Sequence, residues 1–183
     1  MRDSFKMNEG MHGYLEVIST DLEGNSTKIE MNNVVCDNIR TIVRDLVLGK
    51  ITRTNADGQP IELDAPRPAY IVLGYTADLR EATSADTKLA NPLVWVPVHA
   101  DENYPDNKVS ALVWKGQESI LFSITLDYGV ANTDMGQFNE IGLAVPSQYH
   151  TDNYLATRIA MVNRDSMTKT PANKLTLHYY LSF

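Results

Sequence analysis

Alternation between apolar and polar residues is the main pattern in the second half of this chain. It is clearest in KLTLHYYLSF at 174–183, where Leu175, Leu177 and Tyr179 alternate with other residues. Residues two apart lie on the same face of a strand, so one face is expected to meet a core, and the last residue, Phe183, is expected to be buried. Comparable runs, separated by turn-forming residues, occur at 69–75, 93–99, 109–114, 118–128, 138–145 and 154–162. These runs predict a mainly β fold, a two-sheet antiparallel β-sandwich.

The N-terminal part of the chain combines a hairpin with a segment of helical period. Strand-like runs on either side of Gly24 and Asn25 predict a hairpin at 12–32, because both residues tolerate positive φ in a tight turn. Residues 1–10 are polar and are expected to be flexible. Farther along, apolar residues share one helical stripe, which predicts one amphipathic α-helix at 38–48 near the N-terminus. The stripe consists of Ile39, Ile42, Val43, Leu46 and Val47.

Two segments show neither the alternation of a strand nor the spacing of an amphipathic helix, and we predict long surface loops at 50–68 and 76–92. The first contains three prolines, beginning with Pro60, and prolines cannot donate backbone hydrogen bonds. Loops longer than about 12–15 residues are commonly functional or disordered, and we expect these two to form contact surfaces. A chain of 183 residues is long enough for one domain with a substantial core. We therefore predict a single β-sandwich domain over 1–183.

Net charge and cysteine content narrow the range of partners. The chain has 16 Lys and Arg residues against 23 Asp and Glu, a formal net charge of −7. An acidic chain without a basic cluster argues against nucleic acid as a partner. No apolar run reaches the ~20 residues that span a bilayer, and the N-terminus shows no apolar leader, so no membrane partner is predicted. The single cysteine, Cys36, is interpreted as a small buried residue of a protein that folds in a reducing cytoplasm.

The stretch GQFNEIGLAV at 136–145 places one acid, Glu140, among apolar residues. A glycosidase-like enzyme needs two carboxylates at a short, defined separation, and Asp127 could supply the second from a neighbouring strand. Alternatively, the Glu140 carboxylate has a structural role, in which it accepts backbone N–H groups or pairs with an arginine. Arg158 stands in a strand-like run, and a buried pair of this kind holds strand register more than it adds stability. We therefore predict a structural ion pair between Glu140 and Arg158, and no catalytic residues.

Metal and cofactor sites leave no recognisable pattern in the sequence. The histidines His12, His99, His150 and His178 do not stand at metal-ligand spacing from one another or from Cys36. Glycine-rich phosphate-binding motifs and the G-x-S-x-G motif of hydrolases are also missing from the sequence. We therefore predict no metal and no cofactor.

Several short motifs follow one another in a characteristic order. An N-terminal hairpin is followed by NNVVCDNIRTIVRDLVLG, AYIVLGYT, ADTKLANP and FNEIGLAV, then by a strand containing ATR, and finally by KTPANKLTLHYYLSF. From about Gly13 to Phe183, this order resembles that of a family of small virion structural proteins of tailed bacteriophages. The stretch GYTADLREATS and the lack of an arginine after ADTKL depart from the family's pattern, which bears on loop conformations rather than on the fold.

The resemblance implies a non-enzymatic structural component of a tailed bacteriophage particle, located in the virion after assembly in the cytoplasm of the bacterial host. Its place would be the tail, neck, baseplate or fibre-attachment region, and a capsid decoration protein is the alternative. Expected partners are other virion proteins and further copies of the chain in a ring or trimer. Trp95, Tyr104 and Trp114 are candidate interface residues, because aromatic side chains dominate interface energetics, although the tryptophans could instead be core residues. A different class, a carbohydrate-binding module, would use exposed aromatics such as Tyr154 and Tyr180.

Overall fold

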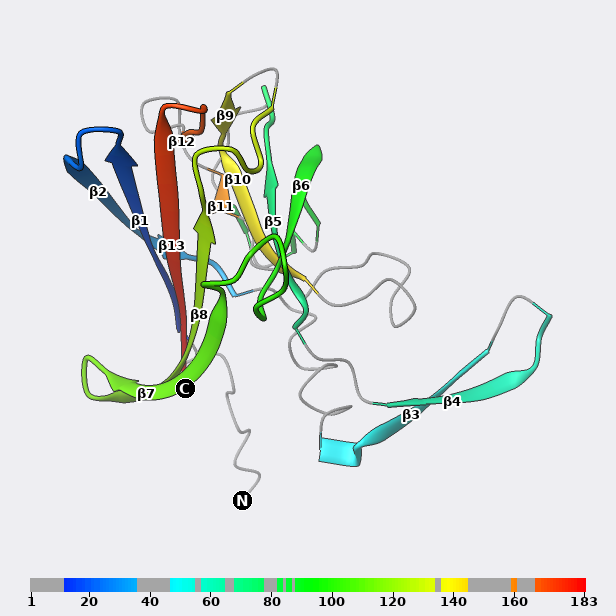
Figure 1. Ribbon diagram of the computed structural model, residues 1–183. Coiled ribbons are helices and arrows are strands. Elements are labelled where there is room, and N and C mark those ends of the chain that lie inside the picture. Colours follow the sequence, from blue (N-terminus) through cyan, green and yellow to red (C-terminus); the bar gives the residue numbers. More distant parts are fainter. Residues whose placement is uncertain are drawn as a thin grey trace.

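Within the part of the chain that the structure describes, the fold is mainly β and its sheets are antiparallel (Figure 1). This computed structural model describes residues 12–35, 47–54, 57–64, 68–77, 82–83, 85–86, 88–133, 136–144, 159–160 and 167–183, with the backbone alone at 50–54, 61, 63–64 and 159–160. The predicted mainly β class is confirmed.

The larger sheet has five strands in the order β2-β1-β13-β8-β7. Strand β13 lies at its centre, and it pairs with β1 from His12 opposite Ser182 to Asp21 opposite Asn173. The alternation predicted for β13 is confirmed, because Leu175, Leu177 and Tyr179 are buried. The strands of this sheet are β1 (His12–Asp21), β2 (Ser26–Asn33), β7 (Lys108–Trp114), β8 (Gln117–Leu126) and β13 (Asn173–Ser182).

Phe183 does not share this burial, and the expectation that it is buried is wrong. Strand β13 ends at Ser182, and Phe183 is 50% exposed. Its backbone N–H still donates to the Glu118 carbonyl at 3.0 Å. The backbone pairing thus continues by one residue, but the last ring lies at the margin of the sheet, where described residues cover only part of it.

The second sheet has the order β11-β10-β5-β6. All residues of β10 are buried, Glu140 included. The sequence places Pro97 in a strand-like run, which favours an edge strand or a bulge, and β6 is an edge strand. The register shifts between Leu73 and Gly74, where a Cβ added to Gly74 would come within 2.5 Å of the Asn91 carbonyl oxygen. The strands are β5 (Tyr70–Gly74), β6 (Pro92–Pro97), β10 (Glu140–Ala144) and β11 (Ile159–Ala160).

The two sheets share one hydrophobic core in a β-sandwich-like arrangement. Leu15, Phe122 and Tyr179 from the larger sheet belong to the same buried cluster as Ile71 and Ile141 from the second sheet. Figure 1 shows the two sheets side by side as layers. A short pair of strands at one end consists of β9 (Gln137–Phe138) and β12 (Met167–Thr168).

The segment 50–68 differs from the loop that the sequence predicts. Strands β3 (Lys50–Thr54) and β4 (Pro60–Asp64) pair as an antiparallel hairpin. Pro60 does not prevent this pairing, because it is the first residue of β4 and because both strands of a two-stranded sheet are edge strands. Gly58, with φ +77°, lies in the connection between them. Figure 1 shows this hairpin standing apart from the two larger sheets.

The remaining predicted elements are described to different extents. The hairpin at 12–32 is present as β1 and β2, and Gly24 in its turn has φ +88°. The helix at 38–48, apart from its last two residues, and the N-terminus at 1–10 lie outside the described residues. In the segment 76–92, the described residues before β6 form neither helix nor strand.

Candidate functional site

The Glu140 side chain is buried in β10, and its carboxylate binds the backbone. Its two oxygens accept hydrogen bonds from the backbone N–H groups of Ala90 and Asn91, each at 3.1 Å. These bonds reach across β5 and fasten the chain just before β6 to β10. The backbone role considered for Glu140 is therefore observed, whereas Arg158 lies outside the described residues and the ion pair stays a prediction.

The alternative in which Asp127 and Glu140 face one another across neighbouring strands is wrong. Asp127 follows β8, whose neighbours are β13 and β7, whereas Glu140 lies on β10 in the other sheet. The Asp127 side chain is exposed and accepts a hydrogen bond from the Tyr128 N–H at 2.9 Å. The two carboxylates thus lack the common setting that a pair of catalytic acids shares.

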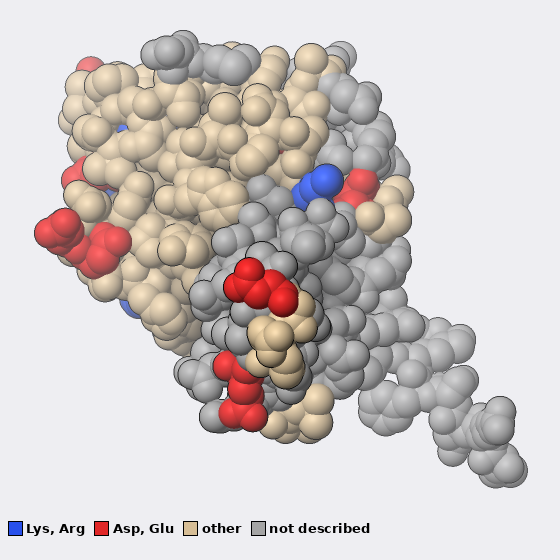
Figure 2. Space-filling model, turned by 90° about the vertical axis from the view of Figure 1, so that its right-hand side faces the viewer, with Lys and Arg blue, Asp and Glu red and all other residues tan. Residues whose placement is uncertain are grey.

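Trp95 and Tyr104, two of the predicted interface residues, lie on different parts of the second layer. Trp95 is 39% exposed on edge strand β6 and contacts the Tyr70 ring edge-to-face, with centroids 5.8 Å apart. Figure 2 shows the side of the molecule on which β6 lies, where the described surface is largely uncharged. Tyr104 is half-buried against the core, and burial together with the charge of Asp101 raises the pKa of its hydroxyl. Trp95 is therefore the more exposed of the two side chains.

The third predicted interface residue, Trp114, belongs to a group on the outward face of the five-stranded sheet, and we name Tyr14, Trp114 and Tyr180 the aromatic cluster. The Trp114 ring stacks on Tyr180, with centroids 4.7 Å apart and planes at 24°. Its centroid also lies 4.7 Å from that of Tyr14. Strand β7 is an edge strand, but the β7–β8 hairpin curls toward this face (Figure 1), and Trp114 at the end of β7 contacts Tyr14 of β1 and Tyr180 of β13. Neither tryptophan belongs to the main core.

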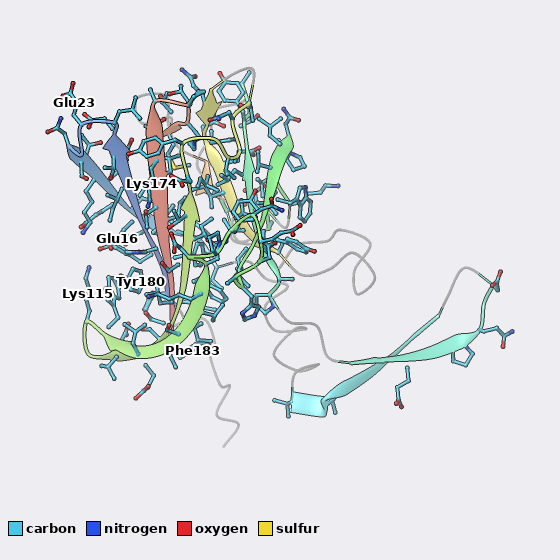
Figure 3. All side chains as sticks on the ribbon, in the orientation of Figure 1. Glu16, Glu23, Lys115, Lys174, Tyr180 and Phe183 are labelled. Atoms are coloured by element: carbon cyan, nitrogen blue, oxygen red, sulfur yellow. The ribbon has the colours of Figure 1, made fainter. Side chains whose placement is uncertain are left out.

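Lys115 completes the cluster from the turn between β7 and β8. Lys115 and Gly116 have φ of +49° and +82°, the conformation of a two-residue hairpin turn that matches the twist of its strands. The Lys115 ammonium lies 4.3 Å from the Tyr14 ring centroid and 4.2 Å from that of Trp114. Such contacts contribute about 0.5–1 kcal/mol at exposed sites. Figure 3 shows Lys115, Glu16 and Tyr180 on the same outward side of the sheet.

Charged side chains extend the aromatic cluster along the same face. Register places Glu30, Glu16 and His178 in one row across β2, β1 and β13. The Lys28 ammonium lies 2.9 Å from a Glu16 oxygen, and the His178 Nδ1 lies 3.4 Å from the other. The Tyr14 hydroxyl donates to Glu30. The face therefore carries a connected network of both signs of charge.

The network changes the proton affinities of its members. Burial acts to raise the pKa of Glu16, but the hydrogen bonds from Lys28 and His178 outweigh it and lower that pKa below its usual value. Burial and the hydrogen bond to Glu30 raise the pKa of the Tyr14 hydroxyl to about 12. The face thus keeps its carboxylates ionised and its tyrosine protonated at neutral pH. Chemically, it offers apolar rings beside hydrogen-bonding charges, which suits contact with a protein surface or a polar ligand.

The sequence pointed to only part of this face. Trp114 was a candidate interface residue, but the expectation that Tyr180 is an exposed aromatic is wrong, because Tyr180 is only 8% exposed, and Tyr154 lies outside the described residues. Tyr14 and Glu16 were not singled out. The missing information is the pairing of β1 with β13, which are separated by most of the chain. Tyr14 and Glu16 stand two apart in a strand, on the face opposite the buried Leu15, and that spacing is the signal that could have identified them.

A small groove opens beside edge strand β2, on the inward side of the five-stranded sheet. Its volume is about 200 Å³, and Ile29 and Thr27 of β2 form one wall. The other residues lining it are Val17, Ser19, Met167, Thr168 and Leu175. Its polar and apolar residues belong to four strands, β1, β2, β12 and β13.

The described part of the chain contains neither a cluster of metal-ligating side chains nor a long apolar helix. No group of three or more His, Cys, Asp or Glu residues gathers there as metal ligands. Among the same residues, no helix has the length and apolar character to cross a membrane.

Comparisons with protein-family models, with curated proteins and with solved structures find no match for this chain. Proposals about its role therefore rest on its own residues, on its fold, and on the order of motifs described above.

Proposed function

We propose that this chain is a non-enzymatic structural component of a tailed bacteriophage particle, in the tail, neck, baseplate or fibre-attachment region. The order of motifs supports the class, and the β3–β4 hairpin that stands apart from the two larger sheets supports a role in assembly (Figure 1). The proposed fold is a closed two-sheet sandwich with an amphipathic helix at 38–48. Its partners are other virion proteins and further copies of the chain in a ring or trimer.

The hairpin carries the proposal because it is poorly suited to stand alone. An isolated two-stranded hairpin is marginally stable in water, and no third strand of the described chain pairs with either edge of this one. Register pairs Ile51 with Leu63, whereas the next pair, Thr52 with Glu62, is polar. The row of Ile51 and Leu63 also contains the pair of Arg53 with Ile61, so three of its four positions are apolar, and such a row matches a neighbour that covers one side of the hairpin.

Exposed apolar residues next to the hairpin support the same role. Val47 and Leu48, which are separated from β3 by Gly49 alone, are 82% and 65% exposed. Large apolar side chains gathered in one place on a surface mark contact sites. We therefore propose that the contact surface extends from Val47 through the hairpin, and that Trp95 contributes a second, smaller contact.

Two alternatives differ from this proposal in different ways. A capsid decoration protein would use the same contacts but would be present in many more copies per particle. A carbohydrate-binding module for the host surface is favoured by one observation, the aromatic cluster that joins three strands. Lys115 already occupies the faces of Tyr14 and Trp114, so a sugar ring would have to displace it. We therefore rank the carbohydrate-binding role second.

Quantitative mass spectrometry of purified particles tests the proposal. We expect the chain in the particle in a small multiple of six or three copies, as rings and trimers require. Hundreds of copies would favour the decoration protein. Particles that lack the chain would refute a virion role, and binding of the purified chain to a glycan array, lost in Trp114→Ala, would then favour the carbohydrate-binding module.

A further inference from the structure

A buried amine lies beside a carboxamide next to the short strands β9 and β12. Lys169 directly follows β12 and is 0% exposed, which is rare for a lysine. Its Nζ lies 2.9 Å from Oδ1 of Asn132, in the connection between β8 and β9. The Asn132 carbonyl carbon is one C=O bond, about 1.2 Å, beyond that oxygen, so the nitrogen and this carbon lie within about 4 Å.

The backbone holds both nitrogen atoms in place. The Tyr128 carbonyl accepts hydrogen bonds from Lys169 Nζ at 3.3 Å and from Asn132 Nδ2 at 3.1 Å. The Thr170 carbonyl accepts a further bond from Nζ at 3.1 Å. The amine and the amide are therefore positioned against each other by one shared acceptor, which is the kind of arrangement that favours reaction between two groups.

The loop that presents Asn132 is under strain. Ala131, the preceding residue, has φ +57°, and a non-glycine residue in this left-handed conformation costs about 1–2 kcal/mol. Residues of this kind persist where the surrounding structure determines their conformation, and they are concentrated at functional sites. The strained turn is thus an observation independent of the Lys169 contacts.

Burial also favours the reactive form of the amine. It lowers the pKa of Lys169, and the charge of Asp127 acts in the opposite direction without reversing the shift. A lowered pKa increases the fraction of neutral amine, which is the nucleophilic form.

We propose that Lys169 and Asn132 become joined by an isopeptide bond. The lone pair of neutral Nζ attacks Cγ of Asn132 and forms a new C–N bond. The bond from Cγ to Nδ2 then breaks, and its electron pair leaves with Nδ2, which takes up one proton from Nζ and departs as ammonia. Nothing is oxidised or reduced, and no other reactant is needed. The bond ties the loop after β8 to the chain between β12 and β13, whether or not the protein is part of a virion.

Intact mass spectrometry of the purified chain tests the proposal. We expect the mass to be lower than the sequence mass by one molecule of ammonia, and a tryptic digest to contain a branched peptide that joins Asn132 to Lys169. Lys169→Arg keeps a cation at this position without the nucleophilic amine, and Asn132→Ala removes the carboxamide, so each variant should have its full calculated mass. Parent protein of full sequence mass, both when fresh and after prolonged incubation at alkaline pH, would overturn the proposal. A lighter species that accumulates during that incubation and yields the branched peptide would support it, whereas a lighter species whose digest lacks that peptide would overturn it.

Discussion

At the scale of single residues, Asn107, Asn139 and Glu140 show how buried polar groups hold this fold together. The Asn139 side chain accepts from the Thr76 N–H at 2.8 Å and donates to the Thr76 carbonyl at 2.7 Å. Asn107 donates to the Pro97 carbonyl at 2.6 Å and accepts from the Thr125 N–H at 2.8 Å. Each side chain satisfies backbone groups at a point where the chain leaves a sheet. Their removal should therefore cost more than the loss of an ordinary surface contact.

Glu140→Gln tests this argument directly. The amide retains one acceptor oxygen, but its NH₂ group would face a backbone N–H, so one buried donor loses its partner. We expect the free energy of unfolding to fall by about 1–3 kcal/mol, as for other buried groups left unsatisfied, measured by urea denaturation. Glu102→Gln, at an exposed turn, is the control and should leave stability nearly unchanged. Equal stability of Glu140→Gln and the parent would contradict the structural role of Glu140.

Glu16 gives the outward face a predictable response to acid. Its pKa is lowered in the folded protein, so its contribution to stability is present above the usual value of 4.5 and is lost as the pH falls below it. Glu16→Gln cannot be protonated and should show a flatter fall in stability below that pH, measured as thermal midpoints across acidic buffers. Glu102→Gln serves again as the control and should keep the slope of the parent. Identical acid slopes in all three proteins would argue against a pKa lowered by Lys28 and His178.

At the scale of elements, the curl of the β7–β8 hairpin depends on the aromatic cluster. Trp114 starts from an edge strand and reaches Tyr180 on the central strand only because the hairpin bends toward the outward face. The positive φ of Lys115 permits a tight turn, and its ammonium then packs on the rings. The turn and the cluster therefore support each other.

Trp114→Ala should show this dependence. Replacing a fully buried tryptophan by alanine lowers the free energy of unfolding by about 3–5 kcal/mol. For the half-buried Trp114 ring we expect a decrease of about 1–3 kcal/mol. Trp95→Ala is the matched control, because Trp95 is 39% exposed on edge strand β6 and lies outside the aromatic cluster, and its loss should be smaller. Larger destabilisation by Trp95→Ala than by Trp114→Ala would show that the aromatic cluster does not stabilise the hairpin.

The sequence predicted single strands better than it predicted which strands pair with one another. The alternation in β13 and the proline at the end of β6 report on local burial and edge position, and both predictions are confirmed. The pairing of β1 with β13 and the assignment of Asp127 and Glu140 to different sheets are long-range properties that no local period contains. The sequence did not predict the β3–β4 hairpin, because Pro60 was taken as evidence against a strand. A proline is compatible with the first residue of an edge strand, which is where Pro60 lies.

At the scale of the whole molecule, the β3–β4 hairpin stands apart from a two-layer body (Figure 1). The described residues of the shared core come mainly from β1, β5, β6, β8, β10 and β13. A formal net charge of −7 makes copies of the chain repel one another unless specific contacts outweigh the repulsion. Under the proposed function, the hairpin supplies those contacts, so changes in it should alter association without altering the body.

Replacing residues 50–64 by a short Gly-Ser linker separates the two properties. We expect the thermal midpoint and far-ultraviolet circular dichroism of the body to stay close to the parent, because the core residues lie elsewhere. Sedimentation velocity should show a concentration-dependent oligomer for the parent and a monomer for the variant. Ile51→Ser with Leu63→Ser removes one apolar pair and should weaken association, while Thr52→Ser with Glu62→Gln, the adjacent polar pair, should not. If the variant still forms an oligomer, the contact between copies lies on another surface. If the parent is monomeric at every concentration, the self-assembly part of the proposal is refuted and only other virion proteins stay as proposed partners.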